Sequence, residues 1–258
     1  MISELLLIVS SFFAPAAVSV AAESHPPTSI VVFVDFSGSI RGADRAAYRR
    51  DLETSILPFL GPGDRIMIAP IHDKTLTGFR PHAEAALPPL PQFNGFVDNT
   101  IKHAQQVKET ERQIAAARQR LKADVAETFR QPIQSRYTDI FSSLLMAEKY
   151  FHGDARRKVL VLMSDMLEDN PPYKFDTMRW RPGDAEKLVD ELAATRRIAD
   201  LTGVCVYVSG ASAPSPALAG HVARFWEAYF ARANADFAPS RYAHVLLHWP
   251  PSKSCAAR

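Results

Sequence analysis

The sequence predicts an α/β protein with a doubly wound, mostly parallel sheet. Short runs of β-branched and other apolar residues alternate with longer amphipathic segments, which indicates right-handed strand–helix–strand crossovers. The chain has 258 residues, 47% of them hydrophobic and 22% charged, which is typical of a globular protein and excludes general disorder. We expect one large domain whose six-stranded sheet has the order 3-2-1-4-5-6, with one antiparallel edge strand, flanked by helices.

The N-terminal half supplies the first strands. Residues 30–35 form a β-branched run that predicts a buried strand, and residues 43–60 have the spacing of an amphipathic helix. Gly61-Pro62-Gly63-Asp64 cannot continue that helix, so we expect a second strand at 65–72. A short segment near 76–79 should pair beside it antiparallel, because the connection between them is brief.

Two unusual segments join the halves of the chain. Pro81 to Pro91 is rich in proline and predicts a loop, whereas residues 96–129 contain no Gly or Pro and predict a long polar helix or a helical hairpin over the domain. Its apolar residues recur at heptad spacing, but a charged companion stripe argues against a coiled coil. The apolar positions are Val107, Ile114 and Leu121, and the charged ones are Glu111 and Arg118.

The C-terminal half continues the alternation. Residues 158–164 read Lys-Val-Leu-Val-Leu-Met-Ser and predict a central buried strand. A long loop at 165–183, rich in proline, aromatic and charged residues, follows it. The other expected elements are helices at 138–151, 184–201 and 216–234 and strands at 204–209 and 242–247.

The residues directly after the first strand carry the strongest functional signal. Asp35-Phe36-Ser37-Gly38-Ser39 places a carboxylate and two hydroxyls at alternate positions, which can converge if the chain turns tightly at Gly38, a residue without a Cβ. Oxygen donors alone suit Mg²⁺, Mn²⁺ or Ca²⁺ rather than zinc or copper. The alternative is that Ser37 or Ser39 only caps the following helix.

Two acids far apart in the sequence are expected to meet at one edge of the sheet. In a doubly wound sheet, ligands bind at the carboxyl ends of the strands where the strand order reverses. In the expected order the first and fourth strands are neighbours there, and Asp35 and Asp165 end them. Thr138 lies in the loop that leads into the helix before the fourth strand, on the same carboxyl-end face of the sheet. Five oxygen-bearing residues should therefore surround one point: Asp35, Ser37, Ser39, Thr138 and Asp165.

This set of five residues resembles the metal-ion-dependent adhesion site of von Willebrand factor A (VWA) domains. Gly63-Asp64-Arg65-Ile66 also looks like the family's turn into its second strand, and Thr138-Asp139-Ile140 is similar to its third loop. The resemblance implies a single VWA-like domain over residues 29–248. Two features depart from the family: the helical insertion at about 96–129, and Ser135-Arg136-Tyr137 in place of a glycine-rich lead-in, where Tyr137 or Arg136 could narrow or cover the site.

The resemblance implies a role for each donor. Ser37, Ser39 and Thr138 would contact the ion directly or through one water, while Asp35 and Asp165 would balance its charge, partly through waters. Mg²⁺ is the preferred ion, with Mn²⁺ and Ca²⁺ as alternatives. Because three contacting ligands are neutral hydroxyls, the ion would stay electrophilic and keep one position open, which an acidic side chain of a protein partner could fill.

Other residues near the expected site have weaker assignments. Asp73 ends the second strand and either lines the rim or lies in water, and the second alternative is favoured. Glu168 and Asp169 either tune the site or lie in water, again with water favoured. Aromatic and arginine side chains of the long loop either anchor a partner or pack the loop onto the domain. The candidate rim for partner binding consists of Asp73, Tyr137, Tyr173, Trp180 and Arg181.

These features predict a non-catalytic, divalent-metal-dependent protein-binding module. No nucleophile–base pair accompanies the oxygen donors, so an enzyme is not expected. A metal-assisted phosphohydrolase is a minor alternative, because haloacid-dehalogenase-like phosphatases need a second acid where this chain has Ser37. A scaffold with a vestigial metal site is the other alternative. Nucleic acid is not an expected partner, since the net charge is +2 and no basic stripe is interleaved with aromatics.

The N-terminus predicts export. Residues 1–22 are apolar from Leu5 onward and end in small residues, which is typical of a signal peptide cleaved after Ala22, although the start carries Glu4 and no Lys or Arg. The protein should then be periplasmic or secreted. The alternative is that the segment remains as a membrane anchor.

Residues 249–258 are expected to form a C-terminal tail. The two cysteines are Cys205, within a strand-like run, and Cys255, within this tail. Cys205 is most simply a buried apolar residue, and a disulfide between the two remains open, because the sequence does not give their separation.

Overall fold

A mixed sheet of six strands lies at the centre of the protein, whose computed structural model describes residues 25–73, 75, 77–95, 99–130, 135–252 and 255. The strand order is β3-β2-β1-β4-β5-β6, as the sequence predicts. Only the β2–β3 pair is antiparallel among these six strands. The strands are β1 (Thr28–Asp35), β2 (Arg65–Ile71), β3 (Ala83–Ala86), β4 (Arg157–Met163), β5 (Val204–Ser209) and β6 (Asp236–Ala243).

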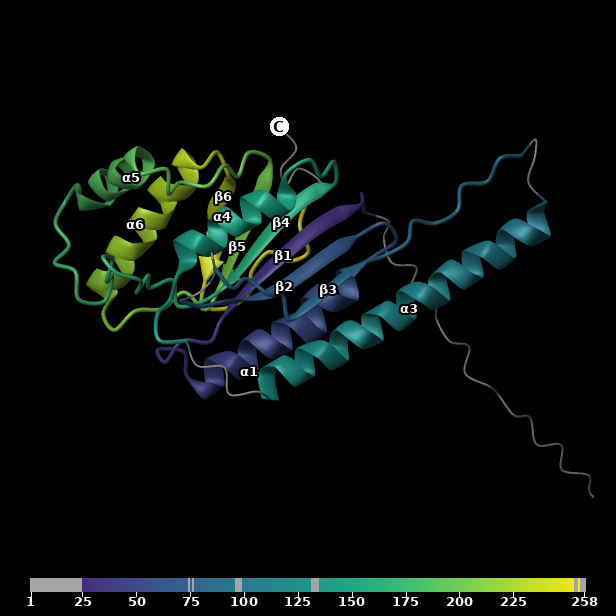
Figure 1. Cartoon of the computed structure of the whole chain (residues 1–258), viewed down its shortest axis with the longest axis horizontal. Coiled ribbons are helices and arrows are strands. Elements are labelled where there is room, and N and C mark those ends of the chain that lie inside the picture. Colours follow the sequence, from purple (N-terminus) through teal and green to yellow (C-terminus); the bar gives the residue numbers. More distant parts are fainter. Residues whose placement is uncertain are drawn as a thin grey trace, which may run out of the picture.

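Helices cover both faces of the sheet (Figure 1). One face packs against α4, α5 and α6, and the other against α1 to α3. Side chains of β1 alternate between the two apolar cores, with Val31 and Phe33 in one and Ile30, Val32 and Val34 in the other. The helical elements are α1 (Gly42–Asp51), the π-helical turn η1 (Leu52–Ile56), α2 (Leu57–Phe59), α3 (Thr100–Arg130), α4 (Ile140–Phe151), α5 (Asp184–Ala194) and α6 (Pro216–Arg232).

Both edge strands differ from the prediction. The antiparallel partner of β2 is Ala83–Ala86, within the stretch expected to be a loop, and not the segment near 79. The last strand begins at Asp236 rather than at 242, because Asn234 has a φ of +55° just after α6 and the chain enters the strand at once. Pro239 lies inside β6, which an edge strand tolerates because one side of its backbone carries no ladder.

The predicted long helix is one continuous element, α3, and not a hairpin. Its C-terminal half packs on α1, α2 and β3 through a buried stripe that contains Ile114, Leu121 and Val125. The N-terminal part is mostly exposed and projects beyond the sheet (Figure 1). None of the described helices is long and apolar enough to span a bilayer.

The helix expected at 184–201 is shorter, because α5 ends at Ala194 and Arg196 takes a left-handed φ of +56°. The predicted signal peptide, residues 1–22, lies outside the described residues. Cys205 and Cys255 form a disulfide with a Cα–Cα distance of 5.7 Å, so Cys205 is not simply a buried apolar residue.

Candidate metal-binding site

Asp35 occupies a fixed position at the carboxyl end of the central strand β1. Its side chain is 0% exposed. Oδ1 accepts a hydrogen bond from the backbone N–H of Ser37 at 2.8 Å, and Oδ2 accepts one from the Ser164 hydroxyl at 2.8 Å. Ser164 directly follows β4, so these two bonds tie the ends of neighbouring parallel strands together and fix the carboxylate between them.

The two serines of the motif converge. The Ser37 and Ser39 hydroxyl oxygens are 3.0 Å apart, and Ser37 forms an isolated backbone bridge with Ser135 of the loop before α4. Neither serine caps α1, whose N-cap residue is Arg41 paired with the Asp44 carboxylate. The capping alternative is therefore wrong.

The expected reason for Gly38 is also wrong. A Cβ at this position would meet no atom within 4 Å, and the residue does not have a left-handed φ. The turn therefore does not require glycine on steric grounds.

Asp165 faces Asp35 from the end of β4. The Asp165 side chain is buried, and Oδ1 accepts a hydrogen bond from the N–H of Leu167 at 3.0 Å. Burial, and then the nearby charge of Asp35, raise the pKa of Asp165 to about 6, although a hydrogen bond with Ser39 acts in the opposite direction. Burial also raises the pKa of Asp35, despite its hydrogen bonds from Ser37 and Ser164. The two acids are thus close enough to repel one another.

The backbone after Asp165 is held in an unusual conformation. Met166 has a φ of +68°, which is unfavourable for a residue with a side chain. The surrounding structure fixes it, because Met166 is fully buried and its carbonyl accepts a hydrogen bond from Trp226 Nε1–H at 2.9 Å. α6 therefore supports the loop that presents Asp165.

Thr138 joins the group from the third loop. It is 2% exposed, and its carbonyl accepts a hydrogen bond from the N–H of Asp169 at 3.0 Å, which ties this loop to the one after β4. Thr138 lines a small cavity of about 170 Å³ together with Ser37 and Ser39. Ser39 also lines a second cavity of about 260 Å³, together with Asp165. Four of the five predicted residues thus line two adjoining cavities, and the fifth, Asp35, is fully buried and accepts a hydrogen bond from the Ser37 N–H.

Two residues that organise the site were not assigned to it from the sequence. Ser164 donates to Asp35, as described above. Glu168 is 0% exposed, and its Oε2 accepts hydrogen bonds from the N–H groups of Ile140 and Phe141 at 2.8 and 3.3 Å, which satisfies the N-terminus of α4 just after Thr138. The expectation that Glu168 lies in water is wrong, and burial raises its pKa well above the ordinary value. No local pattern marks this residue, because its partners are 27 and 28 positions away.

Two candidate rim residues lie beside the Thr138 loop. Asp73 is exposed, and its backbone N–H donates to the Ser135 hydroxyl at 3.1 Å. Tyr137 is half-buried beneath the Arg136 guanidinium, which lies 5.3 Å from the ring centroid. Arg136 is exposed and lines the same cavity as Thr138. Arg136 therefore borders the site without filling it.

The aromatic candidates of the long loop pack against the domain. Tyr173 contacts the Phe141 ring at 5.4 Å, and Trp180 contacts Phe175 at 5.2 Å and donates from Nε1 to its carbonyl at 3.2 Å. Both are half-buried, whereas Arg181 is exposed. The packing alternative therefore describes Tyr173 and Trp180, and a role in partner binding stays a prediction for these three residues.

The donor set fits a hard divalent cation. It consists of two carboxylates and three hydroxyls, and within the described part of the chain neither Asp35 nor Asp165 forms an ion pair. Arg45 contributes a weak favourable charge near Asp35, but its Nη2 donates to the carbonyls of Phe36 and Ser37 instead. A divalent cation between these two buried acids would stabilise them, because it would offset their mutual repulsion and supply the positive charge that they lack.

Comparison with known proteins adds little to this site. No family model matches the chain, and no curated protein matches its sequence. Among solved structures, the open conformation of the pilus adhesin SpaC from Lactobacillus rhamnosus GG is similar, with 12% identity and a TM-score of 0.47 over 91% of this chain and 29% of that one. The manganese-loaded TRAP protein of Plasmodium vivax gives 12% identity and a TM-score of 0.30 over 77% of this chain and 63% of that one.

The chain thus spans less than two thirds of the length of either structure. TM-scores this low support no conclusion about family or function. The fold class is established by the strand order of the sheet itself.

Proposed function

We propose that this protein is an exported, non-catalytic protein-binding module of the VWA type. Its donors Asp35, Ser37, Ser39, Thr138 and Asp165 would hold a divalent cation, preferably Mg²⁺, that captures an acidic side chain of a protein partner. The observation that carries the proposal is the pair of buried carboxylates from adjacent strands, each with a raised pKa and neither in an ion pair among the described residues.

The chemistry of the donors supports binding rather than turnover. The ion would supply an electrophilic centre for a carboxylate ligand, since most of its protein ligands would be neutral hydroxyls. The residues of this chain orient that centre: Ser164 holds Asp35, Glu168 holds the start of α4, and Trp226 holds the loop after Asp165. Ser37 occupies the position where a phosphohydrolase of the haloacid dehalogenase type needs its second acid, which supports a non-catalytic role.

Three further features agree with this proposal. The cavity beside Thr138 is about 170 Å³, which is room for one side chain rather than for a large ligand. The exposed Arg136 on its border could pair with a partner's acid. The Cys205–Cys255 disulfide supports location in an oxidising compartment outside the cytoplasm.

The metal part of the proposal is tested by thermal unfolding of chelator-treated protein titrated with Mg²⁺, Mn²⁺ and Ca²⁺. A ligand that binds only the folded state stabilises it by about 2.7 kcal/mol at a hundredfold excess over its Kd. Asp35→Ala should abolish this stabilisation, whereas Asp73→Asn, an exposed acid at the same end of the sheet, should retain it. A wild-type protein that is indifferent to all three ions would contradict the proposal and favour a scaffold with a vestigial site.

The partner is tested by affinity capture from an envelope extract, with and without chelator, using the wild type and Thr138→Ala. Partners that are retained by the wild type and released by chelator, and that the variant fails to retain, would support the proposal. Partners retained equally in all four conditions would refute capture through the metal.

A further inference from the structure

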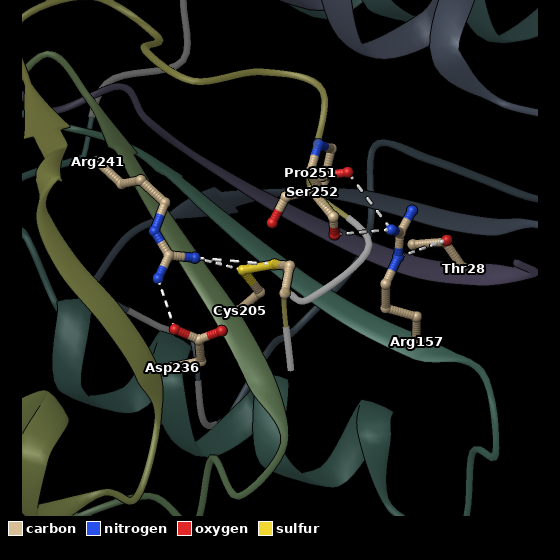
Figure 2. The surroundings of a disulfide bond; sticks show 8 residues. Thr28, Arg157, Cys205, Asp236, Arg241, Pro251 and Ser252 are labelled. Atoms are coloured by element: carbon tan, nitrogen blue, oxygen red, sulfur yellow. Dashed lines mark hydrogen bonds and ion pairs between the residues drawn. A yellow bond between two sulfur atoms is a disulfide. The ribbon is translucent and has the colours of Figure 1, made fainter. Parts of the chain in front are cut away.

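The chain after β6 returns across the sheet as an extended segment, which we call the C-terminal strap (residues 244–252 and Cys255). Trp249 anchors it: the indole Nε1–H donates to the Ser55 carbonyl at 3.0 Å, and the ring lies 5.4 Å from both Phe59 and Tyr207. Arg157 of β4 holds the strap further on, donating from Nη1 to the Ser252 carbonyl at 3.2 Å (Figure 2). The strap therefore covers β5 on the face that carries α1 and α2.

The strap is also tied covalently. Cys205 is the second residue of β5 and 0% exposed, and Cys255 of the strap is 4% exposed. The two sulfurs join elements 50 positions apart in the sequence. Among the described residues, the contacts that would remain without this bond are non-covalent, and they include those of Trp249 and Arg157, the hydrogen bond from the Gly210 N–H to the His244 carbonyl, and apolar packing.

A guanidinium lies directly against both sulfurs. Arg241 of β6 points across to the disulfide, where its Nη1 donates to Cys205 Sγ and lies 3.7 Å from Cys255 Sγ (Figure 2). Its Nη2 donates to Asp236 Oδ1 at 2.6 Å. Arg241 is only 9% exposed, so its charge is poorly screened by solvent.

The Arg241 contact stabilises a thiolate of the reduced pair more than it stabilises the disulfide. A disulfide sulfur is neutral and a weak acceptor, so a buried guanidinium gains little from it. A thiolate in the same place would form a charge-assisted contact, and a neighbouring arginine lowers the pKa of a cysteine. Asp236 offsets part of this charge, but it contacts the other guanidinium nitrogen and is 29% exposed.

The two sulfurs and the Asp236 carboxylate also lie within 4.8 Å of one another, a spacing that could suit a metal ion. The Arg241 cation already contacts both sulfurs and this carboxylate, so a second cation there would be repelled. The chemistry open to these two sulfurs is then thiol–disulfide exchange, which transfers two electrons.

We propose that Cys205–Cys255 is a thiol–disulfide exchange site that accepts a dithiol reductant, with Arg241 as the group that stabilises the released thiolate. A thiolate of the reductant attacks Cys255 Sγ and forms a mixed disulfide, while the S–S bond breaks and Cys205 leaves as a thiolate. The second thiol of the reductant, as a thiolate, then displaces Cys255, which takes up a proton. Two electrons pass from the dithiol, which becomes a disulfide, to the two cysteines.

Two observations give the same direction of attack. Cys205 is fully buried within β5 between β4 and β6, whereas Cys255 lies in a turn of the strap and becomes accessible when the strap opens locally. Cys205 is also the sulfur in closer contact with Arg241, so it is the better leaving group. Reduction therefore releases the strap and converts a covalent tie into a set of weak contacts.

The proposal is tested by equilibrating the full folded chain with defined ratios of reduced and oxidised dithiothreitol and counting free thiols by alkylation and mass shift. Arg241→Gln should make the pair about tenfold harder to reduce at pH 8, a shift of about 30 mV for two electrons. Arg157→Gln is the matched control: it loses the contacts to the strap carbonyls but none to a sulfur, so it should leave the pair as easy or easier to reduce, and never harder. Equal equilibria for wild type and Arg241→Gln would overturn the proposal, as would a pair reducible only after denaturation.

The pH dependence of the wild-type equilibrium is a second measurement that needs no variant. While both reduced cysteines and both thiols of dithiothreitol carry protons, the exchange releases no proton and its equilibrium constant does not depend on pH. Once Cys205 is a thiolate, each exchange releases one proton, and the equilibrium constant for reduction rises about tenfold per pH unit. A change of slope more than one unit below the ordinary cysteine pKa of about 8.5 would support the role of Arg241. A change of slope at or above that value would overturn it.

Discussion

The free energy of unfolding of the metal-free protein should contain a component that falls as the pH rises from about 4 to about 6. Burial and the charge of Asp35 raise the pKa of Asp165 from 3.8 to about 6 in the folded protein. The difference is about two pKa units, and each unit corresponds to about 1.36 kcal/mol. Because Asp165 is only 6% exposed, solvent screens this effect little, and the component should be on the order of 3 kcal/mol.

The sign follows from proton binding. The folded protein holds a proton on Asp165 over a range in which the unfolded chain has lost it, so the unfolded state binds fewer protons there. The favourable contribution is complete below pH 3.8 and is lost as the pH passes through about 6. Asp35, whose pKa is also raised, acts in the same direction. Bound Mg²⁺ should remove the dependence, because metal binding favours the deprotonated carboxylates.

Urea denaturation in chelator at intervals from pH 4 to pH 7 measures this component as the difference between wild type and Asp165→Asn. Taking the difference isolates Asp165. Acids with lowered pKa values, such as Asp44 and Asp200, make the free energy of unfolding rise with pH, but they do so equally in both proteins and therefore cancel. The free energy of unfolding of the variant minus that of the wild type should be larger at pH 7 than at pH 4, by on the order of 3 kcal/mol. Parallel curves for the two proteins would refute the electrostatic reasoning about the site.

Three further substitutions test the fold by urea denaturation. Gly210→Ala should lower the free energy of unfolding by roughly 3 kcal/mol or more, because its Cβ would lie 2.1 Å from the buried Tyr48 hydroxyl and its φ is +106°. The control Gly153→Ala, with a φ of +71° but no atom near its Cβ, should lower it by only about 1 kcal/mol. Equal losses for the two variants would contradict the clash. Asp64→Ala should lose about 2–4 kcal/mol, because two backbone N–H groups that donate to its carboxylate at 2.7 Å lose their acceptor; a neutral effect would show that water replaces it. Leu121→Ala should lose about 2–5 kcal/mol if α3 is integral to the core, and a negligible loss would mean that it is not.

The strand order and the placement of the donors could be predicted because they depend on strong, local signals. Fully apolar runs mark β1 and β4 as central strands, and parallel strands bring their carboxyl ends to one edge. Asp35 and Asp165 directly follow or end those runs, so their proximity needed only the strand order. The long helix was equally visible, since no Gly or Pro interrupts it.

The errors lie where local signals are weak. β3 is Ala-Glu-Ala-Ala, with little intrinsic strand preference, and it is a strand because the edge of β2 offers it backbone partners. β6 contains Pro239 and a register shift, which obscure the alternating pattern. The burial of Glu168 and the position of Arg241 against the disulfide depend on contacts between distant segments, which spacing in the sequence does not reveal.

The organisation around Asp35 and Asp165 links the fold to the proposed function. Burying two acids beside one another lowers the stability of the folded protein near neutral pH, yet hydrogen bonds from Ser37, Ser164 and Leu167 hold both carboxylates in place. A site evolved only for stability would replace at least one acid with a neutral residue. Retaining both, with hydroxyls between them, is reasonable if a divalent cation supplies the missing charge, and the hydroxyls then leave that cation with enough unbalanced charge to attract one more carboxylate from outside.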